Sequence, residues 1–446
     1  MNSRNYILFV GFQVVLGILI YLMPFLSKVY AALILVVGFL WVVRNNNKGN
    51  EVLYVCAYLV GVEVFLRMTK GNPGYEFVKY AVMIFSVLGM YLSGFSKNAV
   101  AYWIFLILLV PGIIVGMMVL GYETDIRKAI MFNITGPLSL ALLSVYCYRK
   151  EITLKQLNDI LLFVGLPVVS LVVYLTLYTP NLRDMITGTS SNFETSGGFG
   201  PNQVATILGL GMFVFFTRVM YFSKNTLVFW VNIAITLLIL FRGLVTFSRG
   251  GMITGIIMIA FMIIISFLRV NTNARFKISR LLVLIGFALV CTWVYTEVVT
   301  GGLISKRYAN QDALGREKES MLTGRETLIL TELNLFWENP FWGGGVGVGK
   351  EYRIETTGVV AASHNEITRM LGEHGFFGIL AILVLIFTPL ILYLDNKENV
   401  FVFAFLIFWF LTLNHAAMRT AAPSFIYALS LLKVTLYDNK NIIHRK

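Results

Sequence analysis

YILFVGFQVVLGILIYLM, residues 6–23, contains no charged side chain. A helix of about 20 apolar residues crosses the hydrocarbon core of a bilayer, so this stretch predicts a membrane-spanning helix. It lacks the small-residue cleavage site of a signal peptide, which favours a retained span. Similar apolar stretches recur along the 446-residue chain, which is 57% hydrophobic and only 13% charged. A soluble domain is about one quarter charged, so the composition predicts a polytopic membrane protein.

The predicted fold is an all-α, polytopic membrane helical bundle of about 12–14 spans. The net charge of +13 fits this fold, because basic residues in short cytoplasmic loops orient membrane spans during insertion. The distribution of Lys and Arg over the short loops places both termini inside. We expect spans near residues 7–23, 28–43, 52–66, 78–95, 99–120, 129–147, 157–178, 202–221, 226–246, 250–268, 281–300, 375–394, 399–413 and 421–437.

The spans divide the chain into three expected parts, an N-terminal transmembrane bundle (1–300), a periplasmic loop domain (301–374) and C-terminal transmembrane helices (375–446). The loop carries eight Lys/Arg and ten Asp/Glu, so it is a mixed polar surface and not a basic tail. Residues 323–326 match a T-x-x-E capping box, and helical periodicity follows them. We therefore expect short amphipathic helices in the loop, one of them with Arg325 in its first turn.

The run SHNEITRMLGEHGFFG, residues 363–378, contains two of the four histidines. Its first four residues match the S-x-x-E capping box, which predicts a helix that begins at Ser363 with His364 in the first turn. The positive end of the helix dipole disfavours imidazolium, so His364 is expected to be neutral and able to act as a general base. Arg369 lies at helical spacing from two glutamates, a pattern more typical of an ion-paired, solvated face than of catalysis.

Two arginines in FRGLVTFSRGG, residues 241–251, lie at the expected outer ends of spans. An arginine at membrane depth indicates function unless it snorkels to the head groups. Snorkelling is the stronger interpretation for Arg242, whereas function is favoured for Arg249, which two glycines follow. The topology places six candidate residues on the outer face: Asn202, Arg249, Arg325, His364, His415 and Arg419.

Several other kinds of site have no support in the sequence. GGGVGVG, residues 343–349, lacks the strand–loop–helix setting and the Lys-Ser/Thr ending of a phosphate-binding loop. The cysteines have no metal-ligand spacing, and the histidines form no H-x-x-x-H pair. We expect no metal, no cofactor and no nucleic-acid partner.

Four motifs occur in a characteristic order: GGFGPNQVATILGLG (197–211), SRGG (248–251), the GRE…FWENPFWGGGVG run (324–347) and HNEITRMLGEHGFFG (364–378). Together they resemble the O-antigen ligase and O-antigen polymerase family of bacterial envelope glycan enzymes. The last motif fits the family's ligase pattern at His364, Asn365, Gly375 and Gly378. The resemblance covers about 180 residues in addition to the many-span architecture.

The resemblance implies an inverting, metal-independent membrane glycosyltransferase on the periplasmic face of the bacterial inner membrane. Its donor would be a glycan linked to a polyprenyl diphosphate. Arg249 and Arg325 would hold the diphosphate, and His364 would take the proton from the acceptor hydroxyl. We expect further substrate contacts from Arg242, Asn202, Asn365, Arg369, Arg419 and His415.

Three functions stay open at this point. A ligase would move a finished glycan onto lipid A-core or a similar acceptor, and the histidine pattern favours this activity. A polymerase would instead join repeat units that are still linked to their carrier. A transporter of lipid-linked sugars is the third alternative, but it predicts charges along the bundle interior, which are few here.

Overall fold

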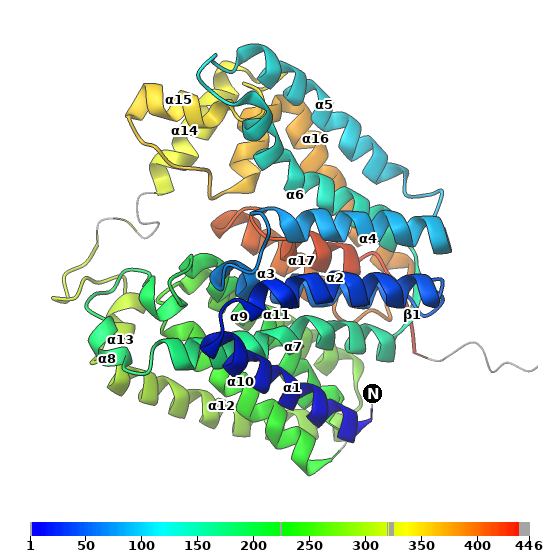
Figure 1. The fold of residues 1–446 in the computed structure, drawn as a ribbon, viewed down its shortest axis with the longest axis vertical. Helices are drawn as coiled ribbons and strands as arrows, with labels where there is room; N and C mark the ends of the chain where they lie inside the picture. Colours follow the sequence, from blue (N-terminus) through cyan, green and yellow to red (C-terminus); the bar gives the residue numbers. More distant parts are fainter. Residues whose placement is uncertain (1, 224, 319, 321–324, 437–446) are drawn as a thin grey trace, which may run out of the picture.

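The computed structural model describes residues 2–223, 225–318, 320 and 325–436, and it is almost entirely helical (Figure 1). Residues 323 and 324 of the predicted T-x-x-E capping box lie outside the described residues. The α-helices are α1 (Ser3–Leu22), α2 (Leu26–Arg44), α3 (Glu51–Met68), α4 (Phe77–Ser93), α5 (Val100–Val119), α6 (Ile126–Cys147), α7 (Leu154–Tyr178), α8 (Leu182–Met185), α9 (Pro201–Tyr221), α10 (Thr226–Leu244), α11 (Arg249–Arg269), α12 (Thr272–Val299), α13 (Leu303–Tyr308), α14 (Arg325–Glu338), α15 (Val348–Thr357), α16 (Glu366–Asp395), α17 (Val402–His415) and α18 (Ala422–Leu429). A 3-10 helix, η1 (Glu194–Ser196), and two short strands, β1 (Glu151–Thr153) and β2 (Lys433–Thr435), complete the described elements.

Ten of the described helices are long and apolar enough to cross a membrane, namely α1, α2, α5, α6, α7, α9, α10, α11, α12 and α16. Helices α4 and α17 are apolar but have only 17 and 14 residues. Helix α3 has 18 residues and carries charged side chains, of which Glu63 and Arg67 form an ion pair of 2.6 Å inside the bundle. The polytopic, all-helical fold is therefore confirmed.

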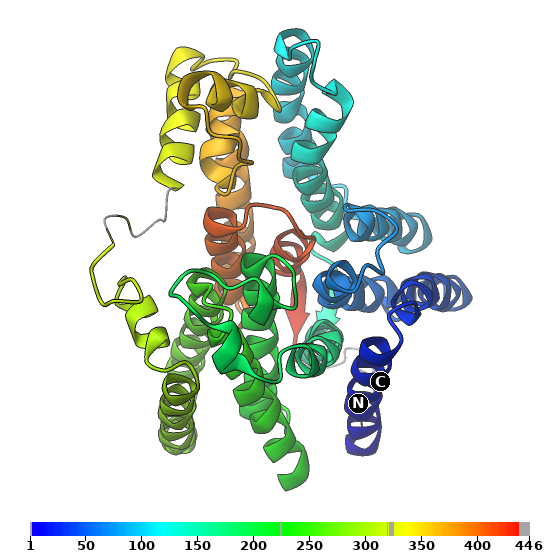
Figure 2. The ribbon, with the colours of Figure 1, turned by 60° about the vertical axis from the view of Figure 1, so that its left-hand side comes forward.

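The last predicted span, residues 421–437, differs from the structure. Helix α18 has only eight residues, which is about 12 Å at 1.5 Å per residue, and β2 follows it. All of its residues are buried, and in Figure 2 this C-terminal segment lies among the other helices. Because α18 packs against protein on every side, it does not need to match the thickness of a bilayer.

The loops collect at two opposite ends of the bundle. The N-terminus and β1 lie at one end, where β1 pairs in parallel with β2 and Ile152 is opposite Val434 (Figure 1). Helices α8, α13, α14 and α15 lie at the other end, which we call the loop end. Both long connections thus share one end, as the topology predicts. That this end faces the periplasm stays a prediction from the charge of the short loops.

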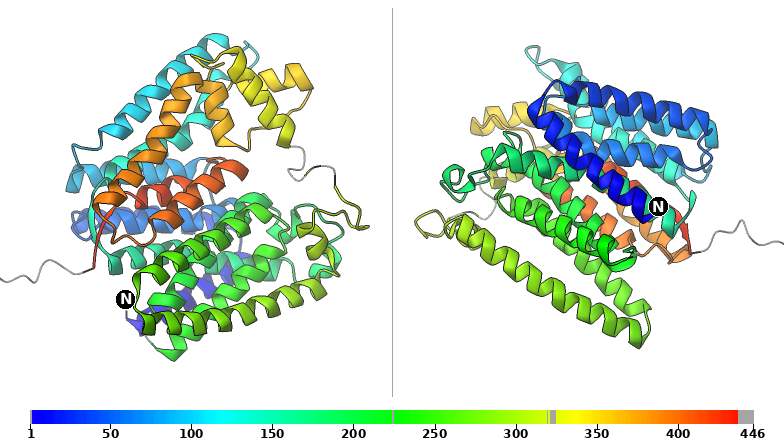
Figure 3. Two further views of the ribbon diagram at one scale, coloured as in Figure 1. Left: turned by 180° about the vertical axis from the view of Figure 1, so that it is seen from behind. Right: turned by 60° about the horizontal axis from the view of Figure 1, so that its bottom comes forward.

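Glycines bring α9 and α11 into close contact in the bundle. A Cβ atom on Gly251 would lie 2.2 Å from the backbone of Ala205, and one on Gly255 would lie 2.5 Å from the carbonyl oxygen of Gly209. Small residues allow membrane helices to approach this closely. The first turn of α9 therefore lies beside the start of α11, where Arg249 is located. Helix α12, by contrast, runs along the edge of the bundle and is largely exposed (Figure 3).

Helix α16 is interrupted at Gly375, whose φ of +58° and ψ of −134° are not helical. The amide of Phe376 donates to the carbonyl of Pro340 at 2.8 Å, and a Cβ on Gly375 would lie 2.5 Å from the amide nitrogen of Gly343. At the kink, the carbonyl of Gly372 accepts a hydrogen bond from the amide of Gly344 at 2.8 Å. The glycine-rich run after Trp342 thus packs against α16, and its amides are used there.

The expected loop domain, residues 301–374, contains α13, α14, α15 and the first turns of α16. Helix α13 contacts α12, whereas α14 and α15 contact α16. Helix α16 begins at Glu366, inside the expected loop domain, and its kink lies at the predicted boundary between residues 374 and 375. The division into parts 1–300, 301–374 and 375–446 stays a proposal.

Candidate active site

The helix that carries the predicted base begins later than the capping-box pattern predicts. The N-cap of α16 is Asn365, whose side-chain oxygen accepts from the amides of Ile367 and Thr368 at 2.9 and 3.3 Å. His364 therefore precedes the helix, and the prediction that places it in the first turn is wrong. The reason is that asparagine caps a helix as well as serine does. Ser363 instead donates its hydroxyl to the carbonyl of Asn365 at 3.0 Å.

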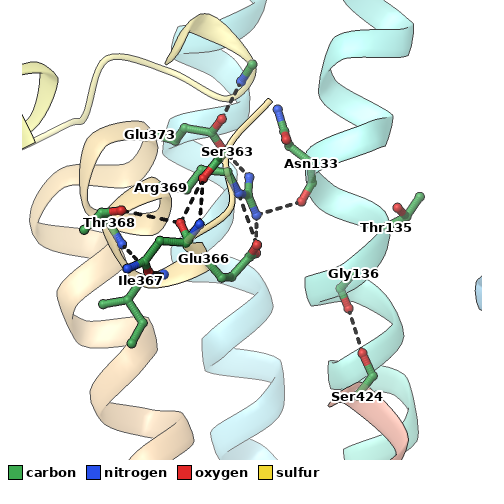
Figure 4. Close-up of polar contacts among 12 residues, drawn as sticks. Asn133, Thr135, Gly136, Ser363, Glu366, Ile367, Thr368, Arg369, Glu373 and Ser424 are labelled. Atoms are coloured by element: carbon green, nitrogen blue, oxygen red, sulfur yellow. Dashed lines mark hydrogen bonds and ion pairs between the residues drawn. The ribbon is translucent and has the colours of Figure 1, made fainter. Parts of the chain in front are cut away.

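Arg369 lies in a buried ion-pair group with Glu366 and Glu373 (Figure 4). It is only 6% exposed, and its Nη2 also donates to the carbonyl of Asn133 on α6 at 3.1 Å. The predicted pairing is therefore confirmed, but the predicted solvated face is wrong, because α6 and the loops cover these side chains. The guanidinium is used inside the protein, so the geometry supports a positioning role between α16 and α6 in place of substrate contact.

His364 is half-buried, and its Nδ1 is a buried atom without a hydrogen-bond partner among the described residues. Burial, followed by the positive charges of Arg419 and Arg325, lowers the pKa of His364 to about 4. The imidazole is therefore neutral at pH 7, as a general base must be before it accepts a proton. The cause differs from the predicted helix dipole, since desolvation and nearby arginines disfavour the imidazolium.

Four arginines from distant parts of the chain form what we call the arginine cluster: Arg249 at the start of α11, Arg307 in α13, Arg325 at the start of α14 and Arg419 between α17 and α18. Burial, followed by the charges of Arg249 and Arg325, lowers the pKa of Arg307 to about 10. Burial and the charges of Arg419 and Arg249 lower the pKa of Arg325. Cations that destabilise one another in this way are suited to bind an anion, and guanidinium groups match phosphate oxygens.

Backbone carbonyls anchor the cluster. Nη1 of Arg249 donates to the carbonyl of Arg307 at 3.3 Å, and Nε of Arg307 donates to the carbonyl of Phe247 at 2.8 Å. Nη2 of Arg419 donates to the carbonyl of Ser363 at 2.9 Å, next to the histidine. Within the described part of the chain, neither Arg307 nor Arg419 forms an ion pair with a carboxylate. Their positive charge is therefore available to a ligand.

Comparison with known protein families finds a match in the second half of the chain. The family model described as O-Antigen ligase matches residues 234–383. Residues 234–383, about one third of the chain, are therefore similar to the O-antigen ligase family. The match includes three of the four motifs that carry the resemblance, and it supports a ligase-type, glycan-processing function in a multi-pass membrane protein. No curated protein matches the chain.

The O-antigen ligase match contains His364 together with Arg249, Arg307 and Arg325, whereas Arg419 lies beyond it. The family thus implies a lipid-linked glycan donor and a glycan acceptor in general terms. The tertiary structure adds Arg419, because the segment between α17 and α18 returns to the loop end beside the ligase residues.

Two further candidates, Asn202 and His415, form hydrogen bonds at the starts of α9 and α11, near Arg249. Oδ1 of Asn202 accepts from the hydroxyl of Ser248 at 2.8 Å, next to Arg249. His415 is 9% exposed, and its Nε2 lies 3.0 Å from the hydroxyl oxygen of Thr206. Because Nδ1 of His415 faces the carbonyl of Leu411 at 2.7 Å, Nδ1 carries the proton and Nε2 accepts. The geometry supports positioning roles for Asn202 and His415.

Asn365, the third polar candidate, is used at both ends of its side chain. Its oxygen caps α16, and its Nδ2 donates to Oδ1 of Asn414 at 3.2 Å. A contact between Asn365 and a substrate stays a prediction.

Arg242 does not behave as the sequence predicts. It is 1% exposed, and its Nη2 donates to the carbonyl of Leu175 and the hydroxyl of Thr179 at 2.8 and 2.7 Å. A third acceptor is the carbonyl of Thr195 at 3.3 Å. The interpretation that Arg242 snorkels to the head groups is wrong, because the side chain is buried inside the bundle, whereas substrate contact by Arg242 stays a prediction. Arg242 therefore connects α10 to the end of α7 and to the segment that follows it through Nη2.

Sequence reasoning missed Arg307 and Arg353. Arg307 lies in the segment SKRY without a motif, and only the fold brings it to Arg249. Arg353 is buried under α14 and α16 and contributes to the lowered pKa of His364. The sequence shows only that both arginines lie in the same long loop as Arg325. The loop contains other basic residues, so this position alone does not identify them as site residues.

Proposed function

We propose that this protein is a membrane glycosyltransferase that moves a glycan from a polyprenyl diphosphate to an acceptor hydroxyl, with lipid A-core as the acceptor. His364 acts as the general base. Arg249, Arg307, Arg325 and Arg419 bind the diphosphate. The observation that carries the proposal is the neutral, half-buried His364 beside arginines whose neighbours are carbonyls.

The reaction is a single displacement. The acceptor oxygen forms a bond to the anomeric carbon while its proton passes to a ring nitrogen of His364. The bond between the anomeric carbon and the diphosphate oxygen breaks, and the diphosphate leaves with the bonding electrons. Attack opposite the leaving group inverts the anomeric configuration. The histidine then releases its proton to water.

The arginine cluster has two effects on this step. It stabilises the negative charge that develops on the leaving diphosphate, as preorganised cations do in phosphate chemistry. Before the donor binds, burial and the charges of Arg419 and Arg325 lower the pKa of His364. The bound diphosphate offsets their charge, so the imidazole becomes a stronger base when the donor is present. In this proposal the guanidinium groups supply the charge that a divalent cation supplies in other glycosyltransferases.

The side of the reaction follows from the same topology. The base and the cluster lie at the loop end, opposite the N-terminus and β1. Basic short loops assign the N-terminal end to the cytoplasm, so we propose that the site faces the periplasm of the bacterial inner membrane.

The test is a transfer assay with purified protein in detergent, an undecaprenyl-diphosphate-linked glycan and lipid A-core, followed by sizing of the products. We expect the glycan to appear on lipid A-core, also in the presence of a chelator. Longer chains that stay linked to the carrier would show a polymerase. No change in the lipid-linked glycan would contradict both activities, and inhibition by the chelator would contradict the metal-independent mechanism.

A further inference from the structure

A cavity of about 670 Å³ lies beneath α15 at the loop end. Its walls come from the start of α6, from α14, α15 and α16, and from the segment that leads to the histidine. Asn133 and Lys350 contribute polar groups, whereas Phe132, Ile354 and Val360 contribute apolar surface. Ligand sites in proteins have volumes of about 300–1,000 Å³ and combine apolar walls with a few convergent polar groups. The cavity has the size and the mixed lining of such a site.

The cavity borders the proposed active site without including the arginine cluster. Ser363 lines it and directly precedes His364. None of the four cluster arginines is among the described residues that line the cavity. A ligand in this space would therefore reach the neighbour of the base while the arginines stay available to the donor.

Arg353 shows that the cavity wall is built for a polar ligand. The side chain is 1% exposed, and its Nε and Nη1 have no hydrogen-bond partner among the described residues. Its Nη2 lies 3.5 Å from Oε1 of Glu332, at the limit of a hydrogen bond. Burying unpaired guanidinium donors is costly. A ligand with acceptor oxygens would remove this cost.

The charges around the cavity indicate which kind of ligand it takes. Five carboxylates and four cations line it, so it has no excess of positive charge that would select a phosphate. Carboxylates accept hydrogen bonds from hydroxyl groups, and Arg353 can donate to them. Glu332, whose pKa is raised by burial, is paired with Nη2 of this arginine. This combination of donors, acceptors and a few apolar side chains fits a neutral saccharide with many hydroxyl groups.

We propose that the cavity beneath α15 binds the saccharide end of the acceptor, and that Arg353 and Glu332 contact its hydroxyl groups. This inference rests on the proposed function and names where the acceptor binds. The acceptor sugar enters beside Ser363, so that its reacting hydroxyl lies next to His364. The lipid diphosphate of the donor occupies the arginine cluster.

A cysteine-protection experiment tests the binding site without turnover. Val360 lines the cavity and is 71% exposed, so Val360→Cys can be modified by a maleimide. The exposed Glu355 on α15 is not among the described lining residues, and Glu355→Cys is the matched control. Both variants carry Cys291→Ser, because Cys291 is exposed whereas the other two cysteines are buried. Lipid A-core, its delipidated core oligosaccharide and undecaprenyl diphosphate are added separately, without donor glycan.

We expect lipid A-core to slow modification at position 360 at least fivefold and to leave position 355 unchanged. The core oligosaccharide should protect position 360 as well, since the saccharide occupies the cavity. Protection by undecaprenyl diphosphate alone would assign the cavity to the donor and overturn the inference. Protection by lipid A-core without protection by the core oligosaccharide would also overturn it, because the saccharide would then not occupy the cavity. If the Val360→Cys, Cys291→Ser protein transfers glycan but lipid A-core does not protect position 360, the inference alone is overturned. If the wild-type protein transfers no glycan, the proposed function is contradicted.

Discussion

The arginine cluster and the cavity beneath α15 lie near the same residue pair, Ser363 and His364, but their chemistry differs. The cluster concentrates four cations, and together with burial its charges lower the pKa of two groups: Arg249 and Arg325 act on Arg307, and Arg419 and Arg325 act on His364. The cavity has nearly balanced charges and a buried arginine with unpaired donors. In the proposed reaction, the cluster would bind the charged leaving group and the cavity would bind the neutral nucleophile, with His364 between them. The contrast suggests that donor and acceptor bind in separate places and meet at the imidazole.

The largest expected effect comes from removing the base between the two regions. His364→Ala should reduce glycan transfer by about 10²–10⁴-fold, the usual contribution of a general base. The protein should still fold, because the imidazole is half-buried and its Nδ1 has no partner among the described residues. Initial transfer rates measure the activity of the variant, and a thermal melt measures whether it is folded. Near-normal turnover by a folded His364→Ala protein would exclude the general-base role.

A smaller loss should follow from weakening the cluster. Arg325→Ala removes charge-assisted hydrogen bonds of about 1.5–3 kcal/mol, so kcat/KM for the lipid-linked donor should fall about 10–100-fold. Arg307→Ala should have a similar effect, because Arg307 also carries charge and holds the turn before Arg249. Lysine at either position should restore part of the activity.

Arg316→Ala is the matched control for the cluster variants. Arg316 lies in the same loop, but its side chain is 74% exposed and pairs with Asp312 at 2.7 Å. Exposed ion pairs of this kind contribute little to stability. If Arg316→Ala lowers donor use as much as Arg325→Ala does, general loss of loop charge explains the result and a specific diphosphate site is contradicted.

Filling the cavity should affect the acceptor alone. Ile354→Trp places a larger side chain in the cavity wall and should raise KM for lipid A-core by about tenfold, or ~1.4 kcal/mol. KM for the lipid-linked donor should stay unchanged. Glu355→Trp, on an exposed position of the same helix outside the lining, should leave both values unchanged. A change in the donor KM of Ile354→Trp would show that the two regions do not separate the substrates.

The smallest effect concerns pH. His364 must be unprotonated to act, and its pKa is lowered to about 4. Transfer at subsaturating substrate should therefore stay constant from pH 7 to pH 5 and fall only near pH 4, where the imidazole takes up a proton. Arg419→Gln removes one of the charges that lower this pKa, so the acid limb of its normalised profile should move to higher pH. A wild-type limb centred near pH 6.5 would contradict a base whose pKa is lowered by burial and by Arg419 and Arg325.

The sequence predicted most of the fold because membrane insertion imposes a local rule. Each of the first thirteen expected spans contains a helix, since about 20 apolar residues must form their backbone hydrogen bonds internally in lipid. The prediction of a membrane span was wrong at residues 421–437. Helix α18 is short there, because protein and not lipid surrounds it. The sequence pattern also placed the start of α16 two to three residues early, since Ser363 and Asn365 are both good caps and only the packing of Glu366 against Arg369 selects between them.

Sequence by itself determined the membrane class, the all-helical architecture and the presence of His364, Arg249 and Arg325 in an ordered set of motifs. The tertiary structure alone decided which arginines lie together at the loop end: Arg307 and Arg419 join the cluster, whereas Arg242 and Arg369 are buried in internal contacts. The physical reason is that helix formation depends on neighbours along the chain, while the exposure of a charged side chain depends on which distant helices pack around it.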